Sequence, residues 1–81
     1  MKVKSVTYAT VDEQWLYAQV GKRMRKAREV AGMPQEEVGY ALRMTRANVS
    51  NIEAGRSAIM LTHLYNLARL LRVSVMEFLP K

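Results

Sequence analysis

Residues 35–56 of the chain read QEEVGYALRMTRANVSNIEAGR. Their apolar spacing predicts one short helix over 35–42 and a second over about 46–54, separated by a very brief connection. Thr45 is a candidate N-cap for the second helix, and Gly55 is placed to end it. Two short helices joined by a turn of about three or four residues are typical of a helix-turn-helix, whose second helix enters the major groove of DNA.

The outward face of the second helix suits contact with base edges. Because successive residues turn by about 100°, Val49 and Ile52 lie about 60° apart and mark the inward side. Small or amide-bearing side chains lie opposite them, namely Ala47, Ser50, Asn51 and Ala54. An asparagine can pair with adenine, and Arg46 at the helix start has the reach to pair with guanine O6 and N7. The alternative interpretation of the same residues is an exposed polar face with no partner.

The composition narrows the class of protein. The 81 residues include 13 Lys and Arg against 7 Asp and Glu, a formal net charge of +6, which favours a polyanionic partner. With no cysteine and one histidine, His63, the chain lacks the ligands of a structural zinc site. No apolar run of about 18 residues and no secretion signal occur, so we expect a cytoplasmic protein that does not span a membrane. No paired carboxylates, activated nucleophile or glycine-rich phosphate loop occur either, so we expect neither catalysis nor a cofactor.

A long amphipathic helix is predicted before the helix-turn-helix. Thr10 and Glu13 fit a capping box, and apolar residues then recur every three or four positions over about 11–31. Gly32 follows as a left-handed residue just past the helix end. Five basic residues between positions 22 and 28 form a solvated face or add general attraction to a polyanion. Trp15 is expected to pack in the core against the C-terminal turn.

Two further helices are predicted after the motif. Leucine and alanine residues define an apolar stripe over about 61–71. A second capping box, Ser74 with Glu77, opens a one-turn helix that extends to Leu79. The fold class is therefore all-α, with five helices in one domain over 10–81.

Residues 1–9 form a separate N-terminal arm in this interpretation. They include several β-branched residues and show no helical periodicity. A flexible arm is the first expectation. The alternatives are a basic arm, through Lys2 and Lys4, that reaches DNA phosphates or a minor groove, and a short strand that pairs with a second subunit.

Four segments taken together carry a family resemblance. They are KAR at 26–28, GMPQEEVG at 32–39, MTRANVSNIEAGR at 44–56 and LYNLARLLRVSV at 64–75. On these segments the chain from Val20 to Leu79 resembles the Cro/repressor-type helix-turn-helix family, also called the XRE family, of phage and bacterial regulators. The resemblance implies a lambda-repressor-like fold that binds double-stranded DNA.

The resemblance also implies roles for individual residues. Positions that face base edges or adjacent phosphates are matched by Thr45, Arg46, Ala47, Ser50 and Asn51. Gln35 matches a glutamine that approaches the phosphate backbone, and Arg43 and Arg56 match positions in the turn and the following loop that contact phosphates. Loss of Arg56 is therefore expected to weaken binding to all sequences alike. Arg28 and Glu53 match a structural ion pair.

Four positions depart from the residues that are common in the family. Pro34 stands where Ser or Thr often caps the helix, and Ile59-Met60 replaces a common Pro-Ser. Arg43 and Arg72 stand where Gly is common. A left-handed backbone at Arg43 would be mildly strained.

The expected function is a transcriptional regulator, a repressor in the first instance, that binds DNA as a homodimer. Family members often pair through their C-terminal helices. The methionines 33, 44, 60 and 76 are expected to fill gaps in the core, and the alternative is an exposed dimer patch of Ile59, Met60, Met76, Phe78 and Leu79. A second candidate is a protein-interaction module of the same fold, such as an antitoxin that binds a toxin, because Trp15 and the apolar loop 58–60 lie outside the DNA-reading helix. A basic membrane-surface helix over 20–31 is a weaker third interpretation.

Overall fold

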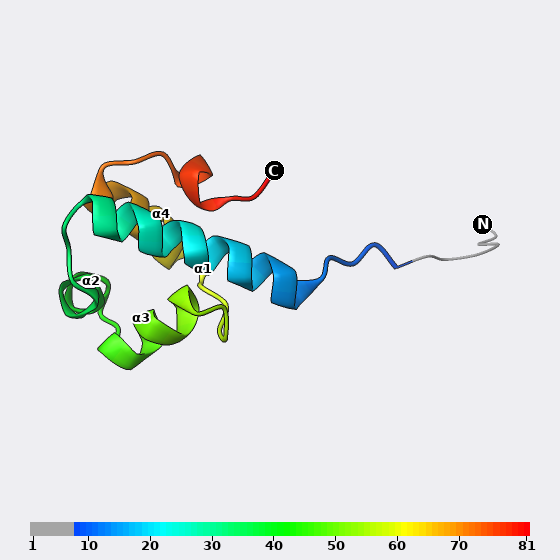
Figure 1. Cartoon of the computed structure of the whole chain (residues 1–81), viewed down its shortest axis with the longest axis horizontal. Helices are drawn as coiled ribbons and strands as arrows, with labels where there is room; N and C mark the ends of the chain where they lie inside the picture. Colours follow the sequence, from blue (N-terminus) through cyan, green and yellow to red (C-terminus); the bar gives the residue numbers. More distant parts are fainter. Residues whose placement is uncertain (1–7) are drawn as a thin grey trace.

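The computed structural model describes residues 8–81 (Figure 1). Within that range the chain forms α1 (Glu13–Val30), α2 (Gln35–Leu42), α3 (Arg46–Glu53), α4 (Leu61–Leu71) and a final 3-10 turn, η1 (Val75–Phe78). The all-α fold is confirmed for the described residues, but the expected count of five helices is wrong. The residues after Ser74 make one tight turn, in which the Glu77 N–H donates to the Ser74 carbonyl at 3.0 Å, three residues back. The basic arm through Lys2 and Lys4 that the sequence offers as an alternative falls on residues outside the described range.

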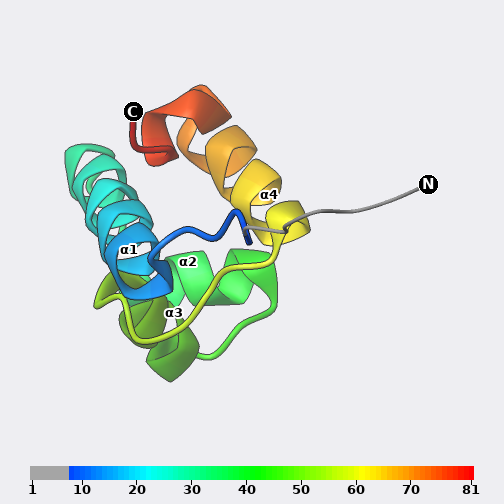
Figure 2. The same cartoon turned by 90° about the vertical axis from the view of Figure 1, so that its right-hand side faces the viewer.

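The core is built largely from the predicted apolar faces of the helices, and the C-terminal turn lies beside α1 and α4 (Figure 2). α3 packs against α1 and α2, whereas η1 packs against α1 and α4. Phe78 of η1 is fully buried, as are residues from three of the helices: Val38, Val49 and Leu67. Because burying a phenylalanine contributes about 1.5–3 kcal/mol, the last turn contributes directly to the stability of the bundle.

α1 and α3 meet through main-chain atoms. A Cβ on Gly21 would overlap the carbonyl oxygen of Ile52 and lie 2.6 Å from that of Glu53. A Cβ on Gly55, just past α3, would lie 2.8 Å from the Cα of Ala18. Gly39 in α2 likewise lies close to the main chain, since its Cβ would be 2.8 Å from the carbonyl oxygen of Met44. The close approach at Gly39 is thus made by the turn that leads into α3.

All four α-helices end in the same hydrogen-bonded turn, the Schellman motif. In α3, the Gly55 N–H donates to the Ile52 carbonyl at 3.0 Å and the Arg56 N–H donates to the Asn51 carbonyl at 2.9 Å. The motif needs a left-handed residue just past each helix, and these residues are Gly32 (φ 69°), Arg43 (φ 57°), Gly55 (φ 79°) and Arg72 (φ 57°). The strained backbone expected at Arg43 is thus present, and Arg72 shares it.

The helix starts follow the sequence less closely. Thr45 caps α3 as predicted, because its Oγ1 accepts a hydrogen bond from the Asn48 N–H at 3.0 Å. The capping box at Thr10 is wrong, since Asp12 is the N-cap of α1 and its carboxylate accepts from the Trp15 N–H at 3.1 Å. Ser74 caps η1, but its hydroxyl accepts from the Met76 N–H rather than from that of Glu77.

Several large apolar side chains lie on the surface instead of in the core. Trp15 is exposed because it lies about 140° around α1 from the buried Val20. Met60 and Met76 are exposed, whereas Met33 and Met44 pack against the core as expected. The five-residue exposed patch is also wrong as a set: Phe78 is fully buried, and Ile59 and Leu79 are partly buried against the core.

Candidate nucleic-acid interface

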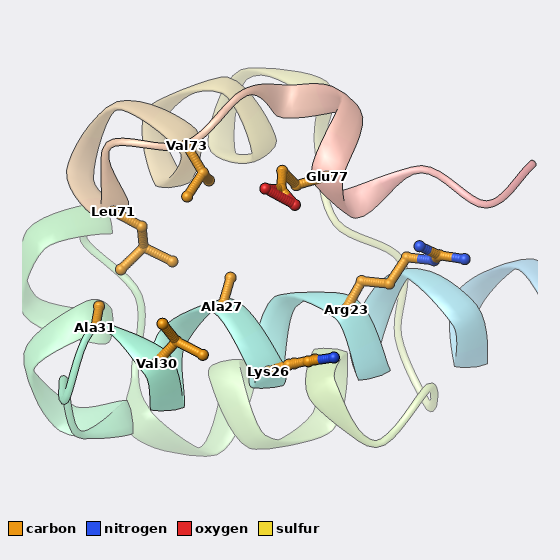
Figure 3. A pocket seen from close by; sticks show the side chains of 8 residues that line it. All are labelled: Arg23, Lys26, Ala27, Val30, Ala31, Leu71, Val73 and Glu77. Carbon is orange, nitrogen blue, oxygen red and sulfur yellow. The ribbon is translucent and has the colours of Figure 1, made fainter.

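α3 presents its predicted outward face to solvent. The helix lies on one side of α1, while η1 lies on the other (Figures 1 and 3). Val49 and Ile52 are buried, which confirms the predicted inward direction. Of the base-facing candidates, Thr45, Arg46 and Ala47 are exposed, whereas Ser50 and Asn51 are half-buried. The outer surface of α3 is thus small and polar, with one arginine at its start.

The three arginines proposed to contact DNA, namely Arg43, Arg46 and Arg56, are all exposed. Within residues 8–81 the ion pairs are Arg25–Glu29 and Arg28–Glu53, so none of these three arginines is paired with a described carboxylate. Arg43 extends from the left-handed position after α2, and Arg56 extends from the loop after α3. Their charges are therefore available to an external anion.

Arg28 and Glu53 form the predicted ion pair between α1 and the end of α3. Arg28 Nε lies 2.6 Å from Glu53 Oε2 and Arg28 Nη2 lies 3.0 Å from Oε1, a bidentate arrangement. The two side chains are only 11% and 4% exposed. The hydrogen bond to Glu53 raises the pKa of Arg28 above its ordinary value, against the opposing effect of burial. Arg28 also donates from Nη1 to the Met33 carbonyl at 2.9 Å, so it ties three segments together.

Gln35 belongs to the same network, which sequence analysis did not predict. Its Nε2 donates to Glu53 Oε1 at 2.9 Å. This hydrogen bond joins the first residue of α2 to the last residue of α3, and it leaves the second amide hydrogen and Oε1 of Gln35 free of any described partner. The glutamine expected beside the phosphate backbone is thus held in place by the buried carboxylate of Glu53.

Asn51 and Arg56 are also joined, a contact that was not predicted. Arg56 Nε donates to Asn51 Oδ1 at 3.0 Å, in addition to the main-chain hydrogen bond between the same residues. A base-facing candidate and a phosphate-facing candidate are therefore in direct contact. The only clue in the sequence was Gly55, because a left-handed glycine brings the residue after it back over the third-last residue of the helix.

One concave region lies away from this surface. An open groove of about 310 Å³ runs between α1 and the C-terminal segment, on the side of α1 opposite α3 (Figure 3). Arg23 and Lys26 line it on α1 and Glu77 lines it on η1. His63 is half-buried, and no group of three potential metal ligands occurs within residues 8–81. None of the helices described has the length and apolar character needed to cross a membrane.

The fold and this surface define a helix-turn-helix protein. The chain belongs to the XRE-type helix-turn-helix family, whose family model, described as helix-turn-helix, matches residues 24–78. The resemblance drawn from the sequence is therefore confirmed. A search of curated proteins finds none that matches.

Solved structures share the fold. The hypothetical transcription factor NHTF from Neisseria is 30% identical, with a TM-score of 0.73 over 94% of this chain and 87% of its own. The restriction-modification controller protein C.AhdI from Aeromonas hydrophila is 26% identical, with a TM-score of 0.71 over 76% of this chain and 94% of its own. Hydroxypropylphosphonic acid epoxidase from S. wedmorenis is 23% identical, and the likeness covers 80% of this chain but 35% of the enzyme, with a TM-score of 0.74. The last similarity is one of fold alone.

Proposed function

We propose that this chain is a sequence-specific DNA-binding transcriptional regulator that reads the major groove with α3 as a homodimer. The observation that carries the proposal is the surface of α3, where small and amide side chains are exposed or half-buried, together with three exposed arginines at and near this helix that no described carboxylate neutralises. Family membership and the named regulators among the similar structures support it. Repression is the proposed mode, since occupying a site on DNA requires only this surface.

Each proposed contact follows from side-chain chemistry. Arg46 would pair with guanine, and Asn51 with adenine, through two hydrogen bonds each. Gln35, Arg43 and Arg56 would bind phosphates, which fixes the register but carries no base information. Thr45 uses its hydroxyl to cap α3, so we assign it a contact only to the backbone of DNA. If each protomer neutralises about four phosphates, the logarithm of the binding constant of the dimer should fall with the logarithm of the salt concentration with a slope of about −7.

Exposed apolar side chains at the start of α4 support the homodimer. Met60, Leu61 and Tyr65 are exposed, and the last two are one helical turn apart on the same face. We refer to these three residues as the α4 stripe. A two-fold contact across the α4 stripe would bury it, and the two copies of α3 would then meet successive major grooves about 34 Å apart.

Selection of bound sequences from random DNA tests the proposal. We expect enrichment of a site with two roughly inverted half-sites about one helical turn apart. Enrichment of a site without half-site symmetry would contradict the homodimer but would still support a sequence-specific regulator. Equal binding to all sequences by a folded chain, confirmed by circular dichroism, would overturn sequence-specific function.

An interaction module is the second candidate, favoured by Trp15 and Val11. Both are exposed, Trp15 in the first turn of α1 and Val11 just before that helix. A protein partner, such as a toxin, would cover them. We expect such a complex to survive about 0.5 M salt, where phosphate contacts are largely screened. Trp15→Ala should then release the partner while DNA binding is unchanged, and a partner retained by that variant would exclude this surface.

A further inference from the structure

The end of α3 places two side chains together by main-chain geometry. Arg56 is the second residue past the cap of the helix, and its N–H donates to the carbonyl of Asn51 at 2.9 Å. In a Schellman motif these two positions usually meet through an apolar contact. Here they meet through a hydrogen bond from Arg56 Nε to Asn51 Oδ1 at 3.0 Å.

This hydrogen bond selects one orientation of the asparagine amide. The oxygen and nitrogen of an amide are similar in size, so an isolated asparagine can present either one to a base. The Nε–H of an arginine is only a donor, and it therefore pairs with Oδ1 and leaves Nδ2 facing away. Oδ1 keeps a second lone pair, so Asn51 can still accept from adenine N6 while it donates to N7.

Arg56 keeps donors for DNA while it holds Asn51. The guanidinium has five N–H groups, and one of them is used in the bond to Asn51. Its Nη1 and Nη2 groups make no hydrogen bond within residues 8–81 and remain for a phosphate oxygen. The hydrogen bond thus links a base-facing side chain to a phosphate-facing one before DNA arrives.

We propose that Arg56 is a specificity-determining positioning residue, which holds the amide of Asn51 in the orientation that reads its base. This inference rests on the proposed DNA-binding function and replaces the expectation that loss of Arg56 weakens all sequences alike. Fixing a side chain in advance removes an ordering cost of about 0.5–1.5 kcal/mol per side chain. We therefore expect loss of the hydrogen bond to reduce discrimination at one base pair by about three- to tenfold.

Arg56→Lys is the main test variant, because it keeps the positive charge but removes the planar Nε–H group. The base pair read by Asn51 is first identified as the one where Asn51→Ala loses its preference in sequences selected from random DNA. Affinity is then measured for the preferred site and for a site changed at that pair, in the parent, each single variant and the double variant. We expect Arg56→Lys to keep the salt slope, because the charge is kept, but to lose more affinity for the preferred site than for the site changed at that pair, so that discrimination there falls. In the Asn51→Ala background it should change discrimination no further.

A measurement without DNA separates this inference from the function on which it rests. In the free protein, NMR should show slower solvent exchange of the Arg56 Nε–H than of the Arg43 Nε–H, and Asn51→Ala should abolish the difference. Parent-like discrimination by Arg56→Lys, or equal losses in both backgrounds, would overturn the positioning role while leaving DNA binding intact. A folded parent that selects no sequence would overturn the function, and with it this inference.

Discussion

Arg28 holds Glu53 side-on, with two nitrogens of one guanidinium on two oxygens of one carboxylate. The pair links α1 to the last residue of α3, and Glu53 in turn accepts a hydrogen bond from Gln35 at the start of α2. One buried carboxylate therefore links α1, α2 and α3. A change in the position of this carboxylate would therefore affect both α2 and α3.

Removing Arg28 should destabilise the fold strongly. We expect Arg28→Ala to lower the free energy of unfolding by about 3–5 kcal/mol, because Glu53 would remain buried without its cation. Arg25→Ala is the matched control: its partner pair with Glu29 is 64% and 55% exposed, so the change should be within about 0.5 kcal/mol. Urea denaturation followed by circular dichroism measures both. A loss equal to that of the control would contradict a structural role.

The raised pKa of Arg28 predicts no alkaline transition near neutrality. A raised pKa in the folded state means that the stabilisation is complete below the unfolded-state pKa and is lost only as the pH rises through the folded-state value. Both values lie far above neutral pH for arginine. Stability measured in the parent and in Arg28→Ala should therefore differ by a constant amount across neutral and mildly alkaline pH. A difference that shrinks in this range would show that the pair is not intact.

Gly21→Ala should destabilise the protein although alanine favours helices. In an open helix this change stabilises by about 0.5–1 kcal/mol. Here the added Cβ would overlap the Ile52 carbonyl oxygen, and main chain cannot move aside easily. We expect a loss of at least about 1–3 kcal/mol. Lys22→Ala, at the exposed neighbouring position, is the control and should be near neutral in thermal denaturation.

The left-handed arginines should gain stability from glycine. Arg72→Gly removes a backbone strain of about 1 kcal/mol, so its melting temperature should rise. Gly32→Ala is the converse test, because its Cβ would meet nothing within 4 Å and only the positive φ opposes it; we expect a loss of about 1 kcal/mol. Arg43→Gly should be stabilised like Arg72→Gly yet bind DNA more weakly. Destabilisation by Arg72→Gly would contradict the strain argument.

Arg46→Ala should relax base preference at one position. We expect a loss of about 1–3 kcal/mol on the preferred site and a smaller loss on random DNA. Arg69→Ala, an exposed arginine on α4, controls for the loss of one positive charge and should leave base preference unchanged. Fluorescence anisotropy with both DNAs provides the comparison. Equal losses on the two DNAs would assign Arg46 to the phosphates instead of the bases.

Leu61→Glu should convert the proposed dimer to monomer. The substitution places a charge in the centre of the α4 stripe, and the side chain is exposed, so the fold itself should survive. Val30→Glu, at an exposed apolar position on α1, is the control. Analytical ultracentrifugation should give half the mass for Leu61→Glu only. A dimer that persists in this variant would place the interface elsewhere.

Local signals in the sequence were sufficient for most of the fold. The bounds of α2, the cap at Thr45 and the glycines that end α1 and α3 follow from propensity and turn chemistry between near neighbours, whereas a left-handed Arg43 was indicated only by the family resemblance and a left-handed Arg72 was not predicted. The errors come from local competition: Asp12 caps α1 because a carboxylate at that position reaches the Trp15 N–H, although Thr10 also fits the pattern. The prediction that Trp15 packs in the core was wrong because it rested on the large apolar side chain. The angular position of Trp15 on α1 turns it away from the core.

The site was less predictable because its hydrogen bonds join distant or flexible groups. The ion pair of Arg28 and Glu53 came from the family resemblance and not from spacing, since 25 residues separate the partners. The bonds from Gln35 to Glu53 and from Arg56 to Asn51 depend on the rotamers of long side chains in the folded chain. Neither partner choice can be read from residue types, because each of these side chains has several possible partners.

The contact between α1 and α3 through Gly21 and Gly55 does not depend on the residues that α3 exposes on its outer face. Main-chain atoms of α1 and α3 approach closely there, and the side chains on the outer face of α3 take no part in that contact. Substitutions at Arg46, Ala47 and Ser50 can therefore accumulate without refolding the bundle. If α3 reads DNA as proposed, a lineage that carries this crossing can change the DNA sequence it recognises while it keeps the same scaffold.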